Sequence, residues 1–185
     1  MENFLENEKE LVNLARDDDQ AFEQLYNHYF PKIYGYVFKR VGHHETAEDI
    51  VSKTFTKVFL NLKDYEHKGF TFGAWVYKIA TNNLIDHYRS SSKKKDVVDI
   101  ENIAEPEAPG MGIDEQVDQH QKSDHVRQLL KELPEKDQQI VSLKYFAEMS
   151  GVEIAGVLEI TENNARVKLS RALNKFHQIY EKYGE

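Results

Sequence analysis

The chain has 185 residues, which is long for one minimal helical domain and sufficient for two small ones. Hydrophobic residues make up 40% of it, so it can form packed cores and is not a wholly disordered protein. It has no cysteine, which excludes disulfides and thiolate zinc sites, and no signal peptide or apolar run of about 20 residues that could span a membrane. These properties predict a cytoplasmic protein without membrane insertion.

The net charge of −8 is unevenly distributed. Residues 1–95 contain 14 Lys or Arg and 14 Asp or Glu, and residues 122–185 contain 10 of each. Residues 96–121 hold 8 acidic residues, two prolines and no Lys or Arg, which predicts a flexible acidic linker between two neutral domains. This linker is either a solvated tether or a segment that lies in a basic channel of a larger partner, in imitation of a nucleic acid. Neutral domains gain little from counterion release, so neither should bind duplex DNA tightly alone.

Apolar residues at spacings of three and four predict an all-α fold with two small helical domains. The first long helix is expected after Asp17–Asp19, which can cap it, and should end near Gly42, with Pro31 bending it. A second helix is expected from Thr46. Its buried face consists of Val51, Phe55, Val58 and Leu62. Its other face is polar and consists of Asp49, Ser52, Lys53 and Thr56.

A third helix is expected after a loop at 63–71, with the rings of Phe70 and Phe72 near its start. One stripe of this helix begins apolar and ends polar: Trp75, Ile79, Asn82, Asp86 and Arg89. The polar end is either a local network, in which Asp86 accepts hydrogen bonds from its neighbours, or part of a platform for unstacked bases of single-stranded DNA.

Two segments of this half, 47–51 (AEDIV) followed by Thr54 and Phe55, and 72–82 (FGAWVYKIATN) followed by Asp86 and Arg89, resemble conserved region two of bacterial RNA polymerase sigma factors of the extracytoplasmic-function (ECF) type. The resemblance implies that the exposed face of the second helix binds the clamp coiled coil of the largest polymerase subunit. The polymerase-binding residues would be Asp49, Ser52, Lys53 and Thr56, although Ser52 and Lys53 stand where the family commonly has Gln and Glu. It also implies that the third helix and the preceding loop capture a flipped base of the minus ten promoter element. The residues that would do so are Phe70, Phe72, Trp75, Lys78, Asn82 and Arg89.

Residues 122–185 show the pattern of a helix-turn-helix. Leu133-Pro134 precedes the first expected helix, Ser150 can cap the next, and Thr161 can cap the last. The outward face of the last helix consists of Asn163, Asn164, Arg166, Val167, Lys168, Ser170 and Arg171. Such residues suit a major groove, where Arg reads guanine, Asn reads adenine, and Ser or Lys holds phosphate.

The run 133–143, followed by 153–155 (EIA) and 164–172 (NARVKLSRA), resembles region four of the same sigma factors. The resemblance implies that the last helix contacts the minus thirty-five element. Glu159 stands where the family usually has a turn glycine, and it costs about 1 kcal/mol if its φ is positive. In the family an anti-sigma factor usually clamps both domains, so the implied partners are core RNA polymerase, promoter DNA and an anti-sigma factor.

The sequence offers no residue set for catalysis. Of His43, His44 and Glu48, the last two could be metal ligands four residues apart on a helix, but a third and a fourth ligand are not evident, so we expect no metal site and no cofactor. A phosphate-binding glycine loop and a nucleophile elbow are also missing, so the chain is not expected to be an enzyme.

The sequence therefore predicts a sigma factor with a region two domain at 1–95, a linker at 96–121 and a region four domain at 122–185. Two alternatives are a free-standing helix-turn-helix repressor, which should bind duplex DNA as a dimer without polymerase, and a protein-interaction adaptor, for which Arg166 and Arg171 would be dispensable.

Overall fold

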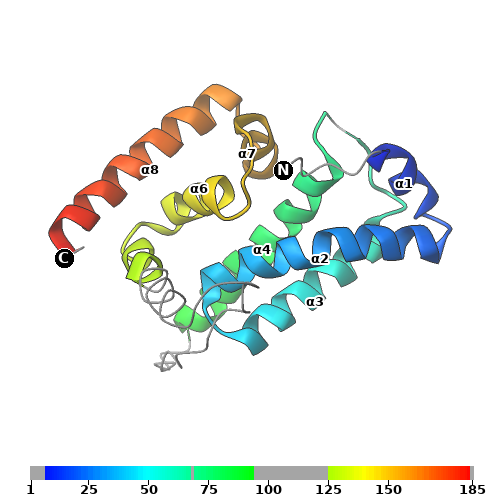
Figure 1. Ribbon diagram of the computed structural model, residues 1–185, viewed down its shortest axis with the longest axis horizontal. Coiled ribbons are helices and arrows are strands. Elements are labelled where there is room, and N and C mark those ends of the chain that lie inside the picture. The colour runs from blue at the N-terminus through cyan, green and yellow to red at the C-terminus, as the bar shows by residue number, and fades with distance from the viewer. Residues whose placement is uncertain (1–6, 68, 94–124, 184–185) are drawn as a thin grey trace, which may run out of the picture.

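The computed structural model describes residues 7–67, 69–93 and 125–183 (Figure 1). The helices are α1 (Glu8–Leu14), α2 (Asp19–Val41), α3 (His44–Asn61), α4 (Phe72–Lys93), α6 (Glu135–Tyr145), α7 (Gly151–Leu158) and α8 (Glu162–Tyr183). Residues 125–131 are also helical. The described residues include no strand, and the predicted all-α fold is confirmed. The predicted linker at 96–121 lies outside the described residues.

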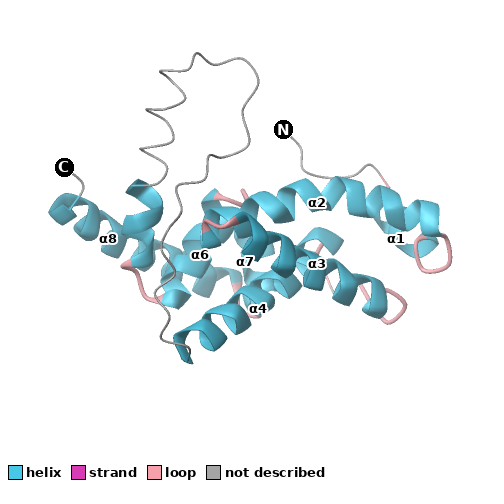
Figure 2. Cartoon of the chain, turned by 90° about the horizontal axis from the view of Figure 1, so that it is seen from below, coloured by secondary structure: helices cyan, strands magenta, loops and turns pink. Residues whose placement is uncertain are grey.

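The first group of helices is built on α2, α3 and α4, which pack lengthwise against one another, with α1 against α2 (Figures 1 and 2). The apolar stripe predicted for the second helix is buried, from Val51 to Leu62. On α2, Leu25, Ile33 and Val37 face the same core. Period-3.6 patterning thus found the inner face of α3 correctly.

Several helix ends lie where the sequence predicts them. Asp18 caps α2, because its carboxylate accepts hydrogen bonds from the backbone N–H groups of Gln20 (2.8 Å) and Ala21 (3.4 Å). At the other end, Gly42 adopts φ 73°, in the left-handed region that favours glycine, and its N–H donates to the Phe38 carbonyl.

The start of α3 differs from the prediction. It begins at His44 rather than at Thr46, because the Nδ1 atom of His43 accepts the backbone N–H of Thr46 at 3.5 Å and caps the helix. His44 stacks on Phe38 with 4.4 Å between ring centroids. Packing and capping therefore account for both histidines.

The short helix α1 was not predicted. Of its seven residues only Val12 is buried, so this segment has little helical periodicity. Contacts with other parts of the chain hold it: the Glu8 carboxylate accepts hydrogen bonds from the Tyr29 hydroxyl and from the Phe72 backbone N–H.

The second group consists of α6, α7 and α8, with Leu143, Ile154 and Ala165 among its buried residues. Ser150 caps α7 in a reciprocal capping box with Glu153, as the sequence predicts. Within the described ranges, none of the helices combines the length and the apolar character needed to cross a membrane.

The two groups touch along α4 and α7, which lie beside each other in both views (Figures 1 and 2). Smaller contacts join α2 to α6. Residues far apart in sequence are thereby brought to one surface of the molecule.

Candidate nucleic-acid interface

The predicted polymerase-binding residues form a continuous exposed strip on α3. The Nζ atom of Lys53 lies 2.5 Å from a carboxylate oxygen of Asp49, and the Thr56 hydroxyl donates to the Ser52 carbonyl at 2.9 Å. One turn farther along, Leu60 has an exposed fraction of 69%. The sequence analysis missed Leu60, although its spacing of four from Thr56 places it on the same face.

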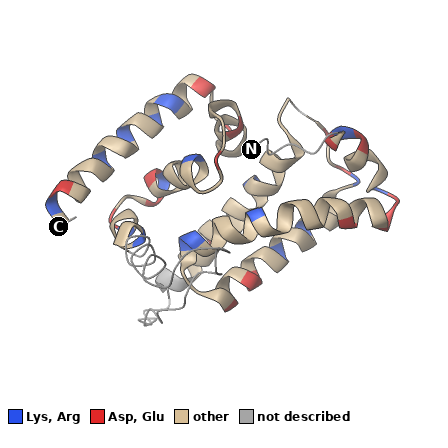
Figure 3. Ribbon diagram, in the orientation of Figure 1, with Lys and Arg blue, Asp and Glu red and all other residues tan. Residues whose placement is uncertain are grey.

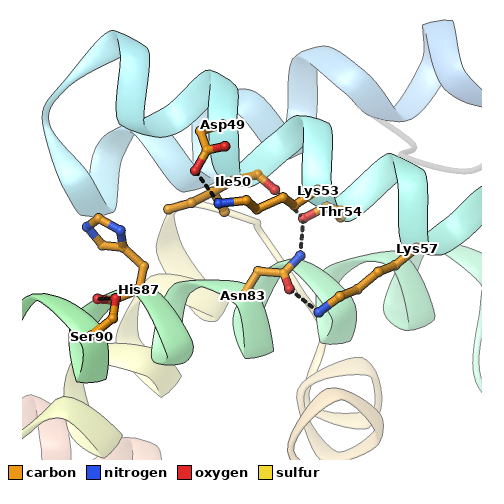
Figure 4. Close-up of polar contacts among 8 residues, drawn as sticks. All are labelled: Asp49, Ile50, Lys53, Thr54, Lys57, Asn83, His87 and Ser90. Atoms are coloured by element: carbon orange, nitrogen blue, oxygen red, sulfur yellow. Dashed lines mark hydrogen bonds and ion pairs between the residues drawn. The ribbon is translucent and has the colours of Figure 1, made fainter.

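Behind this strip, a buried amide connects α3 to α4 (Figure 4). The Nδ2 atom of Asn83 donates to the Thr54 hydroxyl at 3.0 Å, and this hydroxyl donates to the Ile50 carbonyl at 2.7 Å. The other end of the amide, Oδ1, accepts from Lys57 Nζ at 2.5 Å. A satisfied polar network of this kind favours one register of the two helices, because any shift would leave buried groups unpaired.

His87 lies on α4 near the Asp49–Lys53 pair (Figure 4). Burial and the positive charge of Lys53 lower the pKa of His87 from its ordinary value, and the negative charge of Asp49 opposes part of this effect. Since the ordinary pKa is about 6.5, the imidazole is neutral at pH 7. Charge on this part of the surface then comes from the carboxylates and ammonium groups of α3.

Three of the six residues predicted to contact the minus ten element lie together. Phe70, Trp75 and Lys78 line one cavity of about 1020 Å³ between α4 and α7. The Trp75 ring is half-buried against Tyr65, with 4.8 Å between centroids. Lys57, which the sequence analysis did not single out, lines the same cavity. Aromatic faces and ammonium groups thus gather at one place, as a site for unstacked bases and phosphates requires.

The other three residues lie elsewhere. Phe72 has an exposed fraction of only 2% and packs against Tyr29 and Tyr65, so its ring belongs to the core in this conformation. Asn82 and Arg89 are exposed but do not line the cavity. Because a helix rises 1.5 Å per residue, Arg89 lies about 20 Å along α4 from Trp75, beyond the reach of one base.

The predicted minus thirty-five residues all occupy exposed positions of α8, and one of them, Asn164, also lines the cavity between α4 and α7. Each of Asn163, Asn164, Arg166, Val167, Lys168, Ser170 and Arg171 is at least partly exposed. Ala165 and Ala172 face inward, so small residues allow α8 to pack closely on α6 and α7. The Thr161 hydroxyl accepts the Asn164 backbone N–H at 3.2 Å, which confirms the predicted cap.

The charge of α8 is locally basic although residues 122–185 are neutral as a whole. Between Glu162 and Glu181 the helix carries four Lys or Arg and no acidic residue (Figure 3). The Arg166 guanidinium is held by Asn163, with Nη2 donating to Oδ1 at 2.9 Å. A basic helix with exposed Arg and Asn side chains has the groups that read base edges in a major groove.

Two family models match the chain. Sigma-70 region 2 matches residues 25–94, and Sigma-70, region 4 matches residues 123–176. The first model covers α3, α4 and most of α2, and the second covers α6, α7 and most of α8. Region 2 precedes region 4 along the chain, as the sequence resemblance predicts.

The curated proteins that are similar over most of the chain include two sigma factors at 30% identity or more. The ECF RNA polymerase sigma factor BldN of Streptomyces coelicolor is 31% identical over 92% of this chain, which spans 64% of the length of BldN. The RNA polymerase sigma factor YlaC of Bacillus subtilis is 30% identical over 84% of this chain and 93% of YlaC.

Among solved structures, CnrH in its complex with the cytosolic domain of CnrY has a similar fold. The TM-score is 0.72, with 96% of this chain and 99% of CnrH covered. At 18% identity, this likeness concerns the fold alone.

Proposed function

The chain belongs to the ECF-type RNA polymerase sigma factors. From this premise we propose which of its surfaces bind core RNA polymerase and which bind promoter DNA. The exposed strip of α3 binds core RNA polymerase, the surface around Phe70, Trp75 and Lys78 takes an unstacked base of the minus ten element, and α8 reads the minus thirty-five element. Asn82 and Arg89 contact the DNA backbone farther along α4.

The observation that carries this proposal is the outer side of α8. All seven predicted reading residues reach the surface on a capped helix of a helix-turn-helix, and the acidic residues of α8 lie toward its ends. The wall that the first group of helices gives to this cavity supports the second DNA contact, because it combines ring faces with the ammonium groups of Lys57 and Lys78.

We also propose domain limits and partners. Residues 1–95 and 122–185 are the two domains, and residues 96–121 join them. The protein acts in the cytoplasm, without enzymatic activity of its own, and an anti-sigma factor controls it. CnrH, which shares this fold, was solved in complex with the cytosolic domain of CnrY, and this supports a protein partner for the fold.

Transcription reconstituted with core RNA polymerase that lacks any other sigma factor tests the proposed function. On a library of genomic fragments, addition of the protein should produce discrete start sites preceded by two shared sequence elements. Absence of start sites, combined with dimeric binding to duplex DNA without polymerase, would instead support a repressor.

Reversing the charge of Asp49 or Lys53 should weaken binding to core RNA polymerase. The free energy of unfolding should change by no more than about 0.5 kcal/mol, because an exposed ion pair of this kind contributes little. Binding is measured with immobilised core enzyme, and stability by urea denaturation. The double variant Asp49→Lys/Lys53→Glu is the matched control for stability, since it can re-form the ion pair with the two charges exchanged. Wild-type affinity in both single variants would contradict the assignment of this surface.

A further inference from the structure

A direct contact between the two groups of helices involves two of the residues proposed to bind DNA. The Lys78 ammonium on α4 lies 2.7 Å from a carboxylate oxygen of Glu159, which is 81 residues away in the chain. The Phe70 ring packs on the backbone of Gly156 in α7. Both contacts therefore join the first group of helices to the second.

Gly156 allows the Phe70 ring to approach the backbone of α7 closely. A Cβ atom at this position would lie no farther than 2.8 Å from three atoms of the ring, a separation that real Cβ atoms essentially never show. Glycine inside a helix costs stability relative to alanine, because it restricts a flexible backbone and buries no side chain. The presence of glycine inside α7 is therefore explained by the close approach of the ring.

Glu159 occupies a position that favours glycine. It caps α7 with φ 54°, in the left-handed region that a side chain with a Cβ rarely adopts. Glycine would fit the turn with less strain but could not reach Lys78. The ion pair of the Glu159 carboxylate with α4 offsets only part of the cost of this backbone conformation. Since the Glu159 side chain is 73% exposed, this pair is weak and can be broken readily.

We propose that α7 is an internal cover for the minus ten surface, and that α7 and single-stranded promoter DNA exclude each other. The inference rests on the proposed function of Phe70 and Lys78. Gly156 covers part of the Phe70 ring and so keeps that part from contacting a base, and the Lys78 ammonium must exchange the Glu159 carboxylate for a DNA phosphate. The chain alone is closed, and binding to polymerase and promoter separates α7 from α4. DNA binds only the open state, so closure lowers the affinity for DNA. By linkage, bound DNA shifts the equilibrium toward the open state by the same free energy.

The opening can be followed by the distance between two spin labels on the full chain. The protein has no cysteine, so Gln24→Cys on α2 and Gln178→Cys on α8 provide unique attachment sites at exposed positions. Wild-type protein should give one narrow distance distribution. Gly156→Ala should give a longer and broader one, because the new methyl group overlaps the Phe70 ring while alanine favours the helix.

Two controls are matched to these contacts. Gly151→Ala is the same change in the same helix, but its Cβ would lie at an ordinary 3.5 Å from the nearest side-chain atom, so the distance should stay short. Glu159→Lys should open the chain, and the swap Lys78→Glu/Glu159→Lys should close it again. Unchanged distances in Gly156→Ala and Glu159→Lys would overturn the proposed closed state.

The competition is tested with a labelled single-stranded oligonucleotide and no polymerase. Gly156→Ala should bind it several-fold more tightly than wild type, and excess oligonucleotide should lengthen the spin-label distance in wild type. Equal affinities, or no change of distance, would refute the exclusion. The spin-label distances do not depend on transcription, so failure of this inference is distinguishable from failure of the proposed function.

Discussion

Phe72→Ala should lower the free energy of unfolding of the helices α1–α4 by about 3–5 kcal/mol, the usual cost of removing a buried aromatic side chain. Its ring lies among those of Tyr29, Tyr65 and Trp75, at centroid distances of 5.4–5.7 Å. Loss of the ring would leave a cavity directly beneath Trp75. Urea denaturation followed by circular dichroism measures this change.

The matched control is Phe70→Ala, two residues earlier, in the loop before α4. The Phe70 side chain is 39% exposed, so its removal should cost far less stability. Because the Phe70 ring is proposed to contact a base, Phe70→Ala should instead lower the affinity for single-stranded promoter DNA. If the two variants lost equal stability, the distinction between a supporting ring and a DNA-contacting ring would not hold.

Arg166→Ala and Arg171→Ala should each weaken promoter binding by about 1–3 kcal/mol, the usual value of a good Arg contact to a base. Binding of the polymerase complex to promoter DNA is measured at fixed salt concentration, because phosphate contacts make the affinity salt-dependent. Affinity for core RNA polymerase should remain at the wild-type level, since both residues lie on α8, away from the strip on α3.

Lys182→Ala is the control for these two variants. It removes one positive charge from the same helix, eleven residues beyond Arg171, where no base contact is proposed. Its promoter affinity should stay close to wild type. Transcription that is unaffected by Arg166→Ala and Arg171→Ala would show that the assignment of α8 is wrong.

Local sequence signals predicted the ends of most helices correctly. Asp18, Ser150 and Thr161 each accept a backbone N–H at the start of a helix, because capping depends only on residues a few positions away. At Glu159 the resemblance to the family, which usually has a turn glycine there, raised the left-handed conformation that the residue adopts. The start of α3 was missed because a histidine ring nitrogen caps it, and histidine is not among the residues that usually do so.

Contacts between distant segments could not be predicted. The sequence places Phe70 and Phe72 alike near the start of α4, and only packing against α2 decides that Phe72 is buried. Likewise, α1 is held by the hydrogen bonds of Glu8 to residues far along the chain. The side chains that line the cavity with Lys78 come from both groups of helices, so no local pattern identifies them.

Asn83 donates a hydrogen bond to Thr54 and accepts one from Lys57, and this pair of bonds has a consequence for promoter geometry. They make α3 and α4 one rigid body, so that the distance from the polymerase anchor to the melted bases is constant. In the proposed division of the chain, residues 96–121 link this body to the second domain. We therefore expect the choice of start site to depend on the first domain, and the tolerated spacer length between the two promoter elements to depend on the second.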